Sequence, residues 1–243
     1  MSLADNISKW IRQRVKEADA KGVVVGISGG IDSACVAALC KKALGANVLG
    51  LILPCESNPE DERLARLVAD KFHIKLEKVM LDSVYESFGK ALPPAGKLQL
   101  ANIKPRLRMI SLYYFASKMN YLVAGSGNKS ELAVGYFTKY GDGGVDILPL
   151  GGLLKSEVRK LAKELGIPKE IIDRPPTAGL WRGQTDESEM GITYENLDKA
   201  ISAIESGRQK SFFSPQIILK IKKMIKSSQH KRNSIPVYKK SKR

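Results

Sequence analysis

The stretch Val23–Ser33 reads V-V-V-G-I-S-G-G-I-D-S and decides the fold. Its short run of valines and isoleucine is typical of a parallel strand that is buried on both faces. The turn at Ser28–Gly30 then leads into a helix that we expect over Ile31–Leu44, ending at Gly45. The start of a helix leaves backbone N–H groups unpaired, and the helix dipole favours negative charge there. Glycines in the turn let the backbone approach a phosphate, so this stretch predicts an anion site.

Asp32 places an acid beside this anion site. The turn has neither the lysine of a Walker A motif nor the spacing of Gly-x-Gly-x-x-Gly. From the residues alone, two interpretations stay open: Asp32 and Ser33 only stabilise the first turn of the helix, or Asp32 holds a divalent cation that bridges phosphate oxygens. The pattern S-G-G-x-D-S resembles the pyrophosphate loop of the N-type ATP pyrophosphatases, which split ATP into AMP and pyrophosphate.

Three further apolar stretches, Val48–Pro54, Leu76–Leu81 and Tyr121–Gly125, predict the rest of the sheet. Strands that alternate with helices indicate an α/β fold: a doubly wound, mostly parallel sheet flanked by helices, in a single domain over residues 1–243. Ligands of such sheets bind beyond the carboxyl ends of the strands. Gly125–Glu131, G-S-G-N-K-S-E, repeats the order strand, small turn, helix start and acid, so two turns are expected to face one nucleotide. The other helices that we expect are Leu3–Ala20, one that begins at Asn58 and Pro59, Leu100–Met119, Leu153–Leu165, Tyr194–Ile204 and one that begins at Ser214 and Pro215.

The composition limits the class of protein. No apolar run approaches the ~20 residues of a membrane span, and no signal peptide is evident, so we expect a soluble, cytoplasmic protein. The three cysteines form no metal-ligand pattern, and Cys35 and Cys40 are expected to be buried thiols. The net charge of +15 is uneven: residues 208–243 hold 12 Lys or Arg and no acid. Three interpretations of this basic C-terminal arm stay open: it binds nucleic acid, it binds an anionic cofactor, or it only keeps the protein soluble. Aromatic residues are too sparse there for a single-strand binder, and we expect the arm to help attract ATP or a dinucleotide.

Three segments are expected to be loops. Pro93–Lys97 is a short connection. Gly135–Asp146 is rich in glycine and charge, and a loop of this length after a strand–helix turn is more often functional than not. Residues 171–191 contain adjacent prolines and Trp181 without any period, which favours a mobile lid over a segment without a role.

Taken together, the motifs of this chain resemble those of the ammonia-dependent NAD synthetases, and the match covers almost its whole length. Several motifs occur in the family's order and spacing, which is far more specific than the first loop alone. After the pyrophosphate loop they are R-L-R-M-I, G-S-G-N-K-S-E, G-Y-F-T-K-Y-G-D-G-G-V-D, P-L-x-x-L-x-K, R-P-P-T-A-G-L, G-Q-T-D-E-S-E-M-G-I-T-Y and Q-H-K-R-N.

The resemblance implies an enzyme that converts deamido-NAD to NAD, the last step of NAD biosynthesis. In this family the nicotinate carboxylate attacks the α-phosphate of ATP, giving an acyl-adenylate and pyrophosphate, and ammonia then displaces AMP. ATP is thus a co-substrate, and Mg²⁺ is the expected cofactor because charge develops on phosphoryl oxygens.

The resemblance also assigns site residues. Asp32 and Lys155 are implied as catalytic residues, and Asp32 and Glu131 as the magnesium ligands. Without the resemblance, Lys155 reads as a solvated helix lysine and His230 as a surface residue. The implied ATP contacts are Gly26, Ile27, Ser28, Gly29, Gly30, Ile31, Asp32, Ser33, Ser126, Lys155 and Thr177, and the implied deamido-NAD contacts are Arg106, Lys139, Asp146, His230 and Lys231.

Two other functional classes fit part of the pattern. A tRNA-thiolating ATP pyrophosphatase would suit the basic arm, but such enzymes generally need paired cysteines near the site, and Cys35, Cys40 and Cys55 show no such pairing. A non-catalytic RNA- or nucleotide-binding protein would keep only the loop, whereas both Asp32 and Glu131 are retained. Nucleic acid is therefore not expected as a partner.

The nitrogen source and the assembly are also expectations. Only 22 residues precede Val23, which leaves no room for a glutamine-hydrolysing domain there, so free ammonia is the expected donor. The resemblance implies a homodimer with deamido-NAD near the interface.

Overall fold

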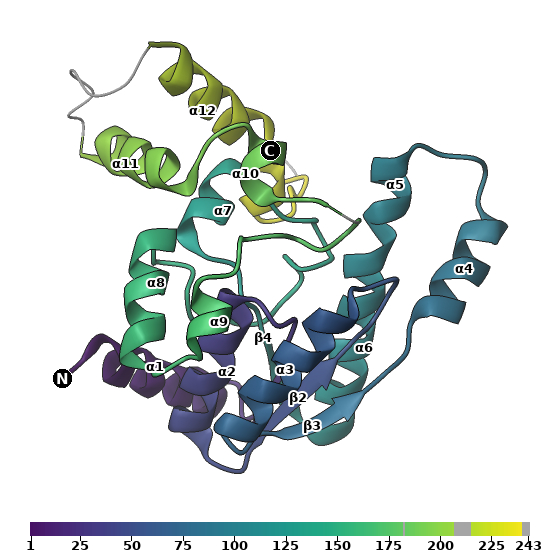
Figure 1. Cartoon of the computed structure of the whole chain (residues 1–243), viewed down its shortest axis with the longest axis vertical. Coiled ribbons are helices and arrows are strands. Elements are labelled where there is room, and N and C mark those ends of the chain that lie inside the picture. Colours follow the sequence, from purple (N-terminus) through teal and green to yellow (C-terminus); the bar gives the residue numbers. More distant parts are fainter. Residues whose placement is uncertain (182, 207–214, 240–243) are drawn as a thin grey trace.

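The computed structural model describes residues 1–181, 183–206 and 215–239. Its centre is a sheet of four strands in the order β3-β2-β1-β4, and every pairing is parallel (Figure 1). The chain therefore winds outward from β1 in both directions, and the predicted doubly wound α/β fold is confirmed. The strands are β1 (Gly22–Gly26), β2 (Val48–Ile52), β3 (Lys75–Lys78) and β4 (Tyr121–Ala124).

The valine run explains why β1 occupies the middle of the sheet. Val23, Val24 and Val25 are at most 1% exposed, and successive side chains point to opposite faces. Val23 and Val25 belong to the core on one face, and Val24 belongs to the core on the other face. Both faces of the sheet must therefore be covered by helices.

Helices pack against each face. The larger core lies under α1 (Leu3–Glu17), α2 (Ile31–Leu44), α3 (Pro59–Lys71) and α8 (Lys155–Glu164). The smaller core lies under α6 (Ile103–Met119), and Tyr85 of α4 (Asp82–Ala91) packs at its edge.

A small helical unit lies beyond the carboxyl ends of the strands, at the top of Figure 1. It has its own core, in which Leu197 and Ile221 are fully buried. The apolar stripe of the helix that begins at Pro215 packs into this core. Ser214 lies outside the described residues. The helices of this unit are α7 (Lys129–Val134), α10 (Asp186–Met190), α11 (Tyr194–Glu205), α12 (Pro215–Ser227) and α13 (Gln229–Arg232).

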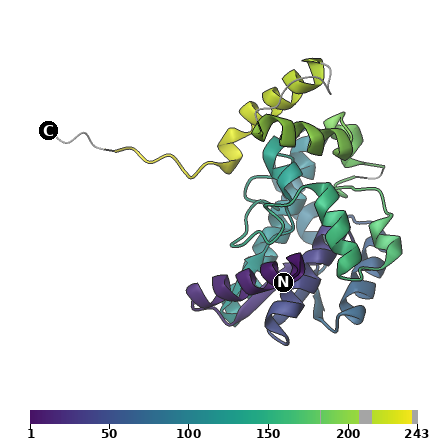
Figure 2. The same cartoon turned by 90° about the vertical axis from the view of Figure 1, so that its left-hand side faces the viewer.

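Several boundaries differ from expectation. The helix expected over Leu100–Met119 is split into α5 (Lys97–Ala101) and α6, because Pro105 has no N–H and fits only in the first turn of a helix. The segment 171–191 is not free of regular structure: it holds the end of α9 (Lys169–Ile172) and all of α10. The basic arm contains the expected helix, α12, and also the short helix α13, which the sequence did not predict; residues 233–239 then extend away from the body (Figure 2). None of the helices in the described part of the chain is long and apolar enough to cross a bilayer.

Candidate active site

The turn after β1 is built as an anion site. Gly29 has φ +77°, a conformation that disfavours side chains, and a Cβ there would lie 2.6 Å from the carbonyl oxygen of Asp61. Gly30 is the N-cap of α2 and gives no side-chain cap, so the first N–H groups of the helix remain for a ligand. The hydroxyl oxygens of Ser28 and Ser33 lie 3.1 Å apart beside them.

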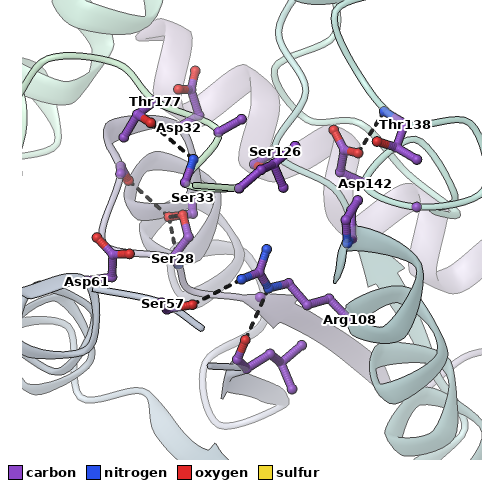
Figure 3. A pocket seen from close by; sticks show the side chains of 18 of the residues that line it. Ser28, Asp32, Ser33, Ser57, Asp61, Arg108, Ser126, Thr138, Asp142 and Thr177 are labelled. Carbon is purple, nitrogen blue, oxygen red and sulfur yellow. Dashed lines mark hydrogen bonds between the residues drawn. The ribbon is translucent and has the colours of Figure 1, made fainter. Parts of the chain in front are cut away.

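A cavity of about 870 Å³ opens over this turn at the carboxyl ends of the strands. Figure 3 shows Ser28 and Ser33 on one side, Thr138 and Asp142 on the other, and Thr177 of the expected lid above. The lining includes the expected ATP contacts Ser126, Lys155 and Thr177. Residues that are far apart in the sequence therefore meet around one space large enough for a nucleotide.

Lys155 is the hub of a buried charge network. It is 1% exposed, and its ammonium group bonds to Asp32 and lies 3.4 Å from Glu131 Oε1. Burial alone would lower its pKa, but the two carboxylates outweigh burial and raise it. Lys155 is therefore a fixed cation at the mouth of the pyrophosphate loop and not the solvated helix lysine that its sequence context allows.

Glu131 lies on the second turn and faces the first. Asn128 caps α7 and also donates from Nδ2 to Asp32 Oδ1 at 2.9 Å, which ties the two turns together. Burial, reinforced by the charge of Asp32, raises the pKa of Glu131 to about 7. The two repeated turns thus bring Asp32 and Glu131 to the same lysine at one edge of the cavity.

Tyr194 and Asp186 extend this network into the helical unit. The Tyr194 hydroxyl lies 3.1 Å from Glu131 Oε1 and 2.9 Å from Asp186 Oδ2, and its ring lies under the Lys155 ammonium at 4.8 Å. Burial raises the pKa of both Tyr194 and Asp186. Neither residue, nor Asn128, is among the predicted site residues, although all three lie in the motifs G-S-G-N-K-S-E and G-Q-T-D-E-S-E-M-G-I-T-Y.

The residues expected to hold deamido-NAD form a group beside the cavity. Arg106 donates to the carbonyl of Lys139 at 3.2 Å, and Lys139 donates to the carbonyl of His230 at 2.8 Å. Lys231 reaches into the cavity lining and donates to the carbonyls of Gly135 and Phe137.

Asp146 lies apart from that group. Its carboxylate accepts from the Val123 backbone N–H at 2.7 Å and from the Tyr113 hydroxyl at 2.9 Å. It therefore fixes the loop after Gly144 to the end of β4. Asp146, Arg106, Lys139 and His230 lie outside the lining of the cavity itself.

The expected lid is held over the cavity by cations from the body. Lys104, 4% exposed, donates to the Leu180 carbonyl at 2.9 Å and pairs with Glu56 at 2.9 Å. Lys97 lies 4.7 Å from the centre of the Trp181 ring. Sequence reasoning missed Lys104, because its partners come from loops 48 residues before it and 76 residues after it.

Oxygen ligands for a hard cation are present, but they do not form a complete cage. Asp32 and Glu131 offer carboxylates that both face the Lys155 ammonium, beside the cavity. Among the residues that the structure describes, no group of three or more His, Cys, Asp or Glu side chains is placed to hold a metal. This donor set fits Mg²⁺, which commonly takes one or two carboxylates and completes its shell with water and substrate phosphates.

Comparison with known proteins decides the family. The family model described as NAD synthase matches residues 3–235. The chain belongs to the NAD synthase family. The NH(3)-dependent NAD(+) synthetase of Carboxydothermus hydrogenoformans is 49% identical over 94% of this chain and 93% of its own length. That of Methanocaldococcus jannaschii is 47% identical over 96% and 95%.

Solved structures of similar proteins share the fold. The NMN synthetase from Francisella tularensis has a TM-score of 0.90 at 36% identity, covering 97% of both chains. The NH3-dependent NAD synthetase from Campylobacter jejuni, solved with a nitrate ion, has a TM-score of 0.86 at 30% identity and covers 98% of this chain and 100% of its own. The resemblance seen in the motifs is thereby confirmed.

Proposed function

We propose that this chain is an ammonia-dependent NAD synthetase that amidates deamido-NAD to NAD and converts ATP to AMP and pyrophosphate. The observation that carries the proposal is the network of Asp32, Glu131 and Lys155 at two facing glycine turns, in a chain about half identical to curated synthetases along nearly its whole length. Free ammonia as the donor follows from the same relatives.

Adenylation of the carboxylate needs the triphosphate fixed and its charge balanced. The N–H groups and hydroxyls of Ser28–Ser33 would bind the pyrophosphate half of ATP, which is the leaving group. Lys155 is buried and stays charged, so its attraction for phosphoryl oxygens would be stronger than that of a lysine in solvent. A bound Mg²⁺, held by Asp32 and Glu131, would supply further positive charge to the phosphates.

Attack by ammonia requires the free base, because ammonium has no lone pair. Burial raises the pKa of Glu131 to about 7 and also raises the pKa of Asp186, so both carboxylates bind a proton more readily than they would in water. These groups would accept the proton that the incoming nitrogen loses. The lid residues around Thr177 and Trp181 would cover the acyl-adenylate and exclude water, which competes with ammonia.

A second candidate substrate is nicotinate mononucleotide, the smaller analogue of deamido-NAD that lacks its adenylate half. It is favoured by the high structural similarity to the NMN synthetase from Francisella tularensis. Product analysis with ATP, magnesium, ammonium and each acid in turn decides between them. We expect NAD, AMP and pyrophosphate in equal amounts from deamido-NAD. NMN formed with a higher kcat/KM would support the second candidate, and ADP with phosphate would refute both.

We further propose that the chain forms a homodimer and works in the cytoplasm. Large apolar side chains are exposed on α4 and α6, which contact each other: Phe88 is 48%, Ile110 60% and Tyr114 62% exposed. The three cysteines are free and buried, which suits a reducing compartment. Sedimentation analysis of the wild type and of Ile110→Glu tests the dimer. A monomeric wild type would refute it.

A further inference from the structure

Arg108 is a cation in the wall of the active-site cavity that forms no ion pair with the described residues, although Asp61, Asp82 and Asp142 lie near enough to favour its charged form. Its Nε donates to the carbonyl of Leu53 at 3.1 Å, and one terminal nitrogen donates to Ser57 Oγ at 3.1 Å. A guanidinium group has five N–H donors, so most of its capacity is left for a further partner. Burial lowers the pKa of Arg108, yet arginine stays charged in proteins. A buried positive charge that has no ion-pair partner is stabilised when an anion binds beside it.

The other cations of the cavity are already bound by protein groups. Lys155 is held by Asp32 and Glu131, and Arg174 pairs with Asp61. Lys231 donates to two backbone carbonyls and belongs to the group of residues assigned to deamido-NAD. Among the described residues of the lining, Arg108 is thus the guanidinium without an ion-pair partner, in a cavity whose proposed ligands are polyanions.

The position of Arg108 indicates which part of ATP or deamido-NAD it would contact. It extends from α6 across the carboxyl end of β2, and its bond to Ser57 fixes it on the loop that leads to α3. In Figure 3 its guanidinium group lies between the Ser28 turn and the loop that carries Thr138 and Asp142. The Ser28 turn is the proposed site of the pyrophosphate half of ATP, whereas the group of Arg106 and Lys139 lies beside the cavity. The space in front of Arg108 therefore lies where the two substrates meet.

We propose that Arg108 is a catalytic residue that binds a non-bridging oxygen of the α-phosphate of ATP. This inference rests on the proposed function. In the step concerned, a nicotinate carboxylate oxygen forms a bond to the α-phosphorus. The bond from this phosphorus to the oxygen that leads to the β-phosphate breaks, and its electron pair leaves with pyrophosphate. Arg108 transfers no proton. It stabilises the charge on the equatorial oxygens, and it is already rigid because Leu53 and Ser57 hold its other edge.

The test uses Arg108→Met and Arg108→Lys with the two diastereomers of ATP that carry sulfur on the α-phosphate. An arginine that contacts one non-bridging oxygen makes the wild type prefer one diastereomer. We expect kcat to fall about 100-fold in Arg108→Met, as for loss of one oxyanion donor, and the diastereomer preference to fall about 10-fold or more. Arg108→Lys keeps the positive charge but lacks the paired N–H donors of the guanidinium group. Its kcat and its diastereomer preference should therefore fall by an intermediate amount.

Two control variants distinguish a direct contact between Arg108 and ATP from a purely structural role of Arg108. Arg66→Met removes an exposed arginine that pairs with Glu62 on α3 and should leave both kcat and the preference unchanged. Ser57→Ala removes one protein bond to Arg108 but keeps the guanidinium, so the preference should persist. If Arg108→Met folds poorly, Arg108→Lys alone decides the test.

Two results would overturn the assignment. An unchanged diastereomer preference in Arg108→Lys and Arg108→Met, with a lower melting temperature, would make Arg108 a structural residue. If the substitutions raised only the KM for deamido-NAD, Arg108 would contact deamido-NAD and not the α-phosphate of ATP. Failure of the proposed function is a different outcome, namely a wild type that makes no NAD; the diastereomer test then runs with nicotinate mononucleotide as acceptor.

Discussion

Replacing Lys155 by methionine removes the cation that holds the two turns together while keeping a side chain of similar length. The variant leaves Asp32 and Glu131 facing each other, with Asp186 joined to Glu131 through Tyr194. Breaking a buried ion pair from one side typically costs about 3–5 kcal/mol of folding stability. For 243 residues, the entropy of unfolding is roughly 0.5 kcal/mol per degree, so the melting temperature should fall by about 6–10 °C at pH 8.

The loss should depend on pH. The pKa of Glu131 is raised in the folded state from 4.5 to about 7, so the folded protein binds more protons than the unfolded chain between those values. Stability from this group is therefore present at low pH and is lost as pH rises towards the folded pKa. Without Lys155 that pKa rises further, and the penalty should be smaller at pH 5 than at pH 8.

The assay is thermal unfolding of wild type, Lys155→Met and Lys160→Met from pH 5 to pH 8. Lys160 is an exposed lysine on the same helix, so its variant controls for the loss of one positive charge. A Lys155→Met protein that melts like the Lys160→Met protein at pH 8, or a penalty that is constant with pH, would refute the buried network.

Four further predictions follow from the site. Asp32→Asn should abolish NAD formation and also lower the melting temperature, because the buried Lys155 ammonium then keeps only Glu131 as an ion-pair partner; an active variant would remove Asp32 from the mechanism. Tyr194→Phe should lower stability by about 1–3 kcal/mol and move the acidic limb of the kcat profile to higher pH, because Glu131 loses a donor to its charged form; an unmoved limb would contradict this. Lys104→Met should raise the KM for ATP and change Trp181 fluorescence in a Trp10→Phe background; unchanged emission would show that Lys104 does not hold the lid. If the basic arm attracts the nucleotides, their KM values should rise steeply with salt, and salt-independent values would rule this out.

Most of the sheet could be predicted because the buried strands β1, β2 and β4 are short apolar runs bounded by turn residues. The first turn could be predicted because Gly29 and Gly30 serve backbone geometry, which is a local property. The helix α10 could not, because five residues with mostly acidic side chains have no apolar period, and only the Thr185 cap marks its start.

Contacts between site residues that lie far apart in the sequence were harder to predict than the individual turns and helices. Lys155 and Asp32 lie 123 residues apart, and nothing in the sequence near Lys155 shows that it is buried. Arg108 lies two residues from Arg106, which the family pattern assigns to deamido-NAD, yet only the fold shows that Arg108 faces the cavity and has no acidic partner among the described residues. Sequence patterns identify local turns and periodic faces, whereas pairings across the sheet depend on how the strands are ordered.

The most direct test is a crystal structure with magnesium and an ATP analogue whose α–β bridge cannot be cleaved. We predict the β- and γ-phosphates on the N–H groups of Ser28–Ser33, with the metal against Asp32 and Glu131 and the ammonium of Lys155 on phosphate oxygens. A nucleotide bound elsewhere, or Asp32 and Glu131 turned away from the metal, would contradict the central claim that these two turns bind ATP for adenylyl transfer.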